Sequence, residues 1–148
     1  MPIIPCQHQP QGLIPLGKTS CDRAPLSLLL GKRVAALSGI ARPESFENFL
    51  VEFGAQVVLS CRFNDHHRFT NAELRDLCKK LTQESVDWVV TTEKDAVRIS
   101  PDCHFPVPVY YLRLKVHIPA VYDVFRYLWV PAKWEEPDFC LEPITETG

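Results

Sequence analysis

Residues 33–54, RVAALSGIARPESFENFLVEFG, decide the fold class of this chain. They begin with a short apolar run, Arg33 to Ser38, which is typical of a buried strand. Pro43 then occupies a suitable first position for a helix, and apolar side chains follow it at helical spacing. These are Phe46, Phe49, Leu50 and Phe53. Gly54 is typical of the residue that ends a helix. The stretch therefore predicts a strand followed by a helix that packs on it.

The same alternation of strand and helix occurs three more times along the chain. Further strands are expected at 55–61, 86–90 and 107–116. Thr70 opens a capping box with Glu73 and predicts a second helix. Thr92 and Asp95 have the same spacing and predict a short helix that continues through Ile99. A last helix is expected from the spacing of Val121, Val124, Phe125 and Leu128.

Strands that alternate with helices across short turns indicate a parallel sheet with right-handed crossovers. We therefore predict an α/β fold with a mainly parallel four-stranded sheet and helices on both faces. The expected strand order is second, first, third, fourth. All four strands lie beyond residue 30 in this scheme.

Proline placement divides the chain into three parts. Five of the 13 prolines fall in the first 25 residues, and proline removes backbone donors and fixes φ. We expect residues 1–30 to be an extended, proline-rich lead-in, with residues 1–25 largely outside the sheet. Residues 31–130 are expected to form the α/β domain. Residues 131–148, which contain prolines and several acidic side chains, are expected to be a tail.

Composition excludes several classes of protein. The 148 residues carry a formal net charge of -2 and are 46% hydrophobic, so no strong basic field points to a nucleic-acid partner. No apolar run approaches the ~20 residues of a membrane-spanning helix, and no secretory signal is visible. The pattern indicates a globular protein of the cytoplasm.

Polar segments follow each of the first three predicted strands. They are 38–43, 62–70 and 91–95. Because the carboxyl ends of parallel strands meet at one edge of a sheet, we expect these segments to lie together, where open α/β sheets bind ligands.

Asp65, His66 and His67 form the densest polar cluster. A carboxylate beside an imidazole can orient the ring for general acid–base work or for contact with a phosphate. The alternative is a solvated turn that Asp65 caps. We predict no metal site, because adjacent loop histidines rarely both reach one ion and no third ligand stands at a suitable spacing.

The segment from Thr91 to Asp95 also permits two interpretations. Thr92, Glu93, Lys94 and Asp95 are candidates for lining a ligand-binding cleft. Alternatively, Thr92 caps a helix, the two acidic residues suit its first turn, and Lys94 is simply exposed.

Residues 12–19, GLIPLGKT, match the phosphate-loop pattern G-x-x-x-x-G-K-[ST]. That loop needs a preceding strand, a following helix and free backbone N–H groups around the phosphates. Pro15 removes one of those donors, and proline-broken sequence precedes the match. We therefore do not expect this segment to bind a nucleotide.

Four segments together resemble the C-terminal part of the tetraacyldisaccharide 4'-kinase family. They are 31–34 (GKRV), 38–46 (SGIARPESF), 63–70 (FNDHHRFT) and 91–98 (TTEKDAVR). They occur in the family's order and at compatible spacing, and the resemblance covers residues 31 to 118.

The resemblance implies a P-loop-kinase-like C-terminal domain of an ATP- and Mg²⁺-dependent lipid kinase. That family phosphorylates the 4'-position of the tetraacyldisaccharide 1-phosphate precursor of lipid A at the cytoplasmic face of the inner membrane. It also implies that Asp65 and His66 act in phosphoryl transfer, and that His67, Thr92, Glu93, Lys94 and Asp95 line the substrate and nucleotide cleft.

The family's nucleotide loop lies in an N-terminal domain that residues 1–30 do not resemble. We therefore expect a C-terminal portion that is inactive alone, has an N-terminal kinase half as partner and touches the membrane through that half. A non-catalytic nucleotide- or anion-binding module is the alternative function.

Overall fold

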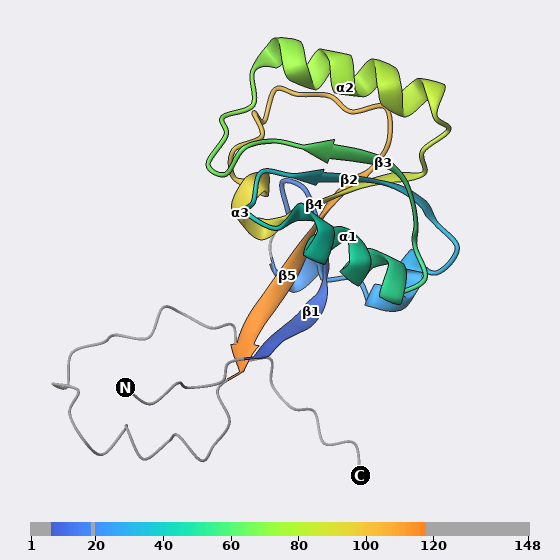
Figure 1. The fold of residues 1–148 in the computed structure, drawn as a ribbon, viewed down its shortest axis with the longest axis vertical. Helices are drawn as coiled ribbons and strands as arrows, with labels where there is room; N and C mark the ends of the chain where they lie inside the picture. The colour runs from blue at the N-terminus through green and yellow to red at the C-terminus, as the bar shows by residue number, and fades with distance from the viewer. Residues whose placement is uncertain (1–6, 19, 118–148) are drawn as a thin grey trace, which may run out of the picture. The chain divides into compact units, whose positions relative to one another are not determined.

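The chain forms a five-stranded sheet flanked by helices, and the computed structural model describes residues 7–18 and 20–117 of it (Figure 1). The strands are β1 (Gln7–Pro15), β2 (Arg33–Ser38), β3 (Gln56–Arg62), β4 (Trp88–Thr92) and β5 (Val109–His117). The helices are α1 (Pro43–Glu52), α2 (Asn71–Gln83) and α3 (Glu93–Ala96), with short 3₁₀ turns η1 (Ser20–Asp22) and η2 (Leu26–Leu29). None of the helices described is long and apolar enough to cross a membrane.

The strand order is β1-β5-β4-β2-β3. Strand β2 pairs in parallel with β3 on one side and with β4 on the other, and β4 pairs in parallel with β5. This confirms the predicted order of the four strands that follow residue 30. It also brings the carboxyl ends of β2, β3 and β4 to the same edge.

Strand β1 corrects the prediction for the N-terminal residues. It pairs antiparallel with β5, so the sheet is mixed and has five strands rather than four. Proline is tolerated here because β1 is an edge strand, and the register shifts between Pro10 and Gly12. Leu13 and Ile14 are fully buried. The expectation that residues 1–25 lie largely outside the sheet was therefore wrong.

Helices α1 and α2 cover opposite faces of the sheet, as predicted (Figure 1). On the α1 side, Phe46 and Leu50 pack in a core with residues of β1, β2 and β5. On the α2 side, Leu77 and Leu81 pack in a second core with residues of β2 and β4. Strand β2 is buried from both sides from its second residue onward.

The ends of the helices follow the predicted capping patterns. Pro43 is the first residue of α1. Gly54 lies just beyond the C-terminal end of this helix and has a φ of +84°. The Thr70 hydroxyl accepts from the Glu73 backbone N–H at 3.2 Å, and the Glu73 carboxylate accepts from the Thr70 N–H at 2.8 Å, completing a capping box. Helix α3 ends at Ala96 and is therefore shorter than the predicted helix, which continued through Ile99.

Two predictions concern residues outside those that the structure describes. These are the last helix, around Val121 to Leu128, and the tail at 131–148. The division of the chain at residues 30 and 130 stays a prediction.

We predict that Leu13→Ala lowers the free energy of unfolding by about 2 to 5 kcal/mol, because the change leaves a cavity in a packed core. Leu13 is completely buried beside Leu29 and Val34. Urea denaturation measures the change, with Val51→Ala as the control because Val51 is 55% exposed on α1. Equal losses for the two variants would show that β1 does not contribute to the core.

Candidate functional site

Three loops meet at the carboxyl edge of the parallel strands, as the sequence predicts. The end of β2 contacts the loop after β3 through a hydrogen bond from the Phe63 N–H to the Ser38 carbonyl at 2.8 Å. The segment after β4 contacts both loops, through side chains of α3 and the residues just beyond it. Polar side chains from distant parts of the sequence therefore share one small region.

Asp95 is completely buried beneath this region. Its Oδ2 atom accepts from the Gly39 N–H at 2.9 Å and from the Thr92 hydroxyl at 2.7 Å. Its Oδ1 atom lies 3.4 Å from Nη1 of Arg98. A Cβ atom at Gly39 would lie 3.2 Å from Asp95 Oδ1, so glycine permits the close approach of this loop. Asp95 therefore connects the loops through hydrogen bonds in the protein interior rather than at the surface.

Asp65 and Lys94 connect two loops that are far apart in the sequence. The Lys94 ammonium donates to Asp65 Oδ1 at 3.0 Å. This hydrogen bond holds the pKa of the Asp65 carboxyl below its ordinary value. Asp65 also accepts from the backbone N–H of His66 at 3.0 Å. The carboxylate therefore stays ionised in contact with a lysine and beside an imidazole.

His66 is exposed but has defined contacts. Its Nδ1 atom lies 3.1 Å from Nη2 of Arg98, and its Nε2 atom lies 3.5 Å from Oδ2 of Asp65. Its φ is +63°, in the left-handed region that costs a residue with a side chain about 1 kcal/mol or more. The contacts of its ring and backbone hold this residue in an unusual conformation.

His67 makes a separate set of contacts. Its ring stacks on Phe63 with centroids 4.9 Å apart, and its Nε2 atom donates to the Glu73 carboxylate at 3.0 Å. The Thr70 N–H, and after it the His67 ring, lowers the pKa of the Glu73 carboxyl to about 2. His67 thus connects the loop to the first turn of α2, whereas His66 contacts Arg98.

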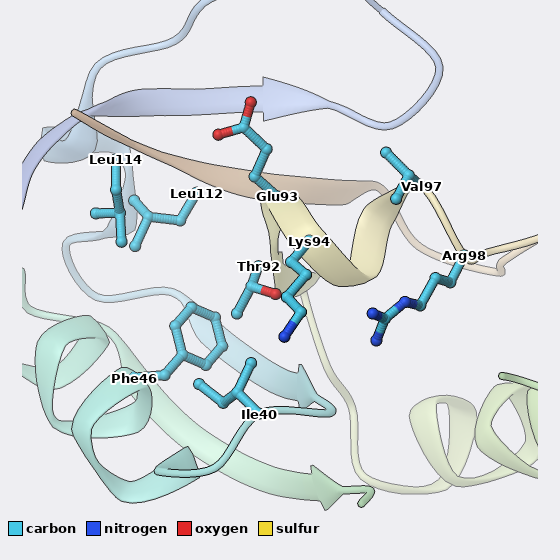
Figure 2. Close-up of a pocket in the computed structure, with 9 residues that line it drawn as sticks. All are labelled: Ile40, Phe46, Thr92, Glu93, Lys94, Val97, Arg98, Leu112 and Leu114. Carbon is cyan, nitrogen blue, oxygen red and sulfur yellow. The ribbon is translucent and has the colours of Figure 1, made fainter. Parts of the chain in front are cut away.

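A cavity of about 620 Å³ lies next to these loops (Figure 2). Figure 2 shows Ile40 and Phe46 on one side of it and residues of α3 on the other. Its lining comprises Ile40, Phe46, Thr92, Glu93, Lys94, Val97, Arg98, Leu112 and Leu114. The surface is mainly apolar, with two cationic side chains, Lys94 and Arg98, and one acidic side chain, Glu93.

The structure thus places three of the predicted cleft residues, Thr92, Glu93 and Lys94, at the cavity. Glu93 also lies 3.8 Å from the Arg113 guanidinium. Sequence reasoning assigned no role to Arg98, although it stands four residues after Lys94, a spacing that places two side chains on the same side of a helical turn. Among the apolar lining residues, the helical spacing of Phe46 predicts only that it packs on the sheet.

The phosphate-loop pattern does not form a phosphate-binding loop. Residues 12–15 lie within strand β1, and Gly12 allows close approach of Ala24, whose carbonyl oxygen would lie 2.8 Å from an added Cβ. Residues 12–15 thus lie in an edge strand rather than in a loop that opens a helix, as the phosphate-loop mechanism requires. The described residues contain no cluster of three or more His, Cys, Asp or Glu side chains with metal-site geometry.

Comparison with known proteins gives a consistent result. Residues 1–128 match the family model described as "Tetraacyldisaccharide-1-P 4'-kinase". A "Tetraacyldisaccharide 4'-kinase" of Anaeromyxobacter dehalogenans is 46% identical over 95 residues, which is 64% of this chain and 25% of that protein. Another of that name, from Syntrophus aciditrophicus, is 32% identical over 79% of this chain and 31% of its own length.

A solved structure has the same fold. It is the crystal structure of LpxK from Aquifex aeolicus in complex with ATP, which aligns with a TM-score of 0.54 and 20% identity. The alignment covers 83% of this chain and 34% of the other. The chain spans about a quarter to a third of the length of these proteins.

We predict that Glu73→Gln removes part of the acid sensitivity of the fold. A carboxyl with a lowered pKa contributes stability that is present above its ordinary value of 4.5 and is lost as the pH falls to about 2. The difference in free energy of unfolding between wild type and variant should therefore shrink between about pH 5 and about pH 2. Urea denaturation across this range measures it.

The matched control is Glu52→Gln, at an exposed position at the end of α1. The prediction would be contradicted if the difference in free energy of unfolding between wild type and Glu73→Gln were the same at about pH 2 as at about pH 5.

Proposed function

Because the chain belongs to the tetraacyldisaccharide-1-P 4'-kinase family, we propose that it is the C-terminal part of an ATP-dependent lipid kinase. The proposed reaction is phosphorylation of the 4'-hydroxyl of the tetraacyldisaccharide 1-phosphate precursor in lipid A biosynthesis. The proposed place of action is the cytoplasmic face of the inner membrane.

The observation that carries the proposal is the convergence of Asp65, His66 and Lys94 at one edge of the sheet. The Asp65 carboxylate is ionised and 41% exposed, so it can meet a ligand. His66 is 69% exposed beside it. Phosphoryl transfer depends mainly on positioning and on neutralising charge, which such a group of side chains supplies.

The adjoining cavity supports a ligand that is both anionic and apolar. Lys94 and Arg98 provide positive charge, whereas Phe46, Ile40 and Leu112 provide an apolar surface (Figure 2). A phosphorylated sugar with acyl chains has this combination of properties. The cavity is therefore a candidate for part of the substrate-binding surface.

The nucleotide loop is proposed to come from an N-terminal kinase half. That half would hold ATP and Mg²⁺, which supply the phosphoryl group and neutralise its charge. In this arrangement Asp65 and His66 would face the cleft between the two halves. His66 would assist the acidic group that accepts the proton of the sugar hydroxyl, and membrane contact would come through the N-terminal half.

We predict that His66→Ala lowers kcat by roughly 10²-fold or more, the scale of a lost general acid–base group. His67→Ala should cost much less, because its ring contacts Glu73 and Phe63 rather than the Asp65 side of the loop. The assay uses the chain combined with an N-terminal half of a relative, with the disaccharide precursor and ATP-magnesium.

Both variants should keep the circular dichroism spectrum of the wild type. The isolated chain is the negative control and should show no turnover, and robust turnover by it would contradict the need for an N-terminal half. Equal losses for the two histidines would show that the wrong ring has been assigned. If neither variant lost activity, the loop would be a solvated turn and a non-catalytic anion-binding module would be the better account.

A further inference from the structure

We infer that Arg98 is a positioning residue that holds His66 in its neutral, Nε2-protonated tautomer. The catalytic consequence of this inference rests on the proposed function, but the geometry that it describes does not. Arg98, which lies just beyond α3, contacts Nδ1 of the ring, whereas Asp65 lies near Nε2. Three observations support it.

The first observation is the chemistry of the contact. Nη2 of Arg98 lies 3.1 Å from Nδ1 of His66. A guanidinium has five N–H donors and no acceptor. The Nδ1 atom must therefore be the acceptor, so it carries a lone pair and the ring proton is on Nε2. The Asp65 carboxylate, 3.5 Å from Nε2, favours the same placement because it can only accept.

The second observation is that the guanidinium is itself held in place. Its other terminal nitrogen, Nη1, lies 3.4 Å from a carboxylate oxygen of Asp95, which is completely buried. Only 20% of the Arg98 side chain is exposed. Asp95 in turn accepts from the Gly39 N–H and the Thr92 hydroxyl. Because Asp95 holds the Arg98 guanidinium in place, this donor can select the tautomer of the His66 ring.

The third observation is the backbone of His66. Its φ of +63° is unfavourable for a residue with a side chain. Such a conformation persists where surrounding contacts determine it, and it is common at functional sites. Here the His66 N–H donates to Asp65, and Asp65 is held by Lys94. The ring is therefore presented to Arg98 by a backbone that these contacts constrain.

Occupation of Nδ1 leaves Nε2–H as the polar group of His66 on the Asp65 side. In this state the ring donates a hydrogen bond and does not accept a proton. His66 would then act on the reaction through the carboxylate or the ligand group that accepts from Nε2. Arg98 contributes by fixing which nitrogen that is.

Nitrogen-15 NMR of the histidine rings in the full 148-residue chain tests the inference, because the shifts of Nδ1 and Nε2 report the tautomer directly. In the wild type, His66 should be neutral with its proton on Nε2. Arg98→Met should shift the tautomer ratio at least 10-fold toward Nδ1–H, about the factor given by loss of one charge-assisted hydrogen bond. Arg98→Lys keeps the charge but not the two-pronged geometry, and should give an intermediate ratio.

Arg68→Met is the matched control, because Arg68 is an exposed arginine in the same loop as His66. It should leave the ratio unchanged. An unchanged ratio in Arg98→Met would overturn the inference. If Arg98→Met does not fold, the folded wild type is compared with the wild type unfolded in urea. The same His66 tautomer ratio in both states would also overturn the inference.

Activity is a separate measurement and distinguishes the inference from the proposed function. In the combined enzyme, Arg98→Met should raise KM, because the cavity loses a cation, and should also lower kcat, because the His66 ring is no longer held. Arg98→Lys keeps the cation and should therefore restore KM more fully than kcat. A tautomer shift in the variant, with no kinase activity in any combined enzyme, would overturn the proposed function and uphold the inference. Kinase activity of the combined enzyme, with no tautomer shift in Arg98→Met, would uphold the proposed function and overturn the inference.

Discussion

The buried carboxylate of Asp95 is the constraint on which the site depends. A carboxylate removed from water is strongly unfavourable unless hydrogen bonds and a cation compensate it. Asp95 obtains these partners from three places: the Gly39 N–H after β2, the Thr92 hydroxyl at the end of β4, and Arg98 beyond α3. The loops must therefore stay close to one another, because separation would leave a buried charge without partners.

The loop that follows β3 is held by contacts with two neighbouring elements, the α3 segment and helix α2. Lys94 and Arg98 contact Asp65 and His66 from the α3 side, and Glu73 binds His67 from the first turn of α2. Exposed side chains are thus held in defined positions, which is the arrangement that positioning in catalysis requires. The two adjacent histidines have different contacts: His66 lies against Arg98 and Asp65, whereas His67 lies against Glu73 and Phe63.

The sequence predicts the strands after residue 30 and the caps of α1 and α2, because these depend on local periodicity and capping residues. The expected order of those strands agrees with the structure, although no local pattern encodes strand order. It fails for β1, since the prolines obscure a strand that an edge position tolerates. Capping predicts the contact of Asp95 with Thr92, but not its complete burial, because a surface cap and a buried one share the same spacing. The contact between Arg98 and His66 joins residues 32 positions apart, and no local pattern encodes it.

Hydrogen exchange of the Gly39 amide tests most directly whether Asp95 joins the loops. In the wild type this amide should exchange as slowly as those of β2, because its N–H donates to a buried carboxylate at 2.9 Å. In Asp95→Ala it should exchange at least 10-fold faster, about the effect of losing one charge-assisted hydrogen bond, while the amides of β2 stay slow. A Gly39 amide that stays as slow in a folded Asp95→Ala variant would contradict the account.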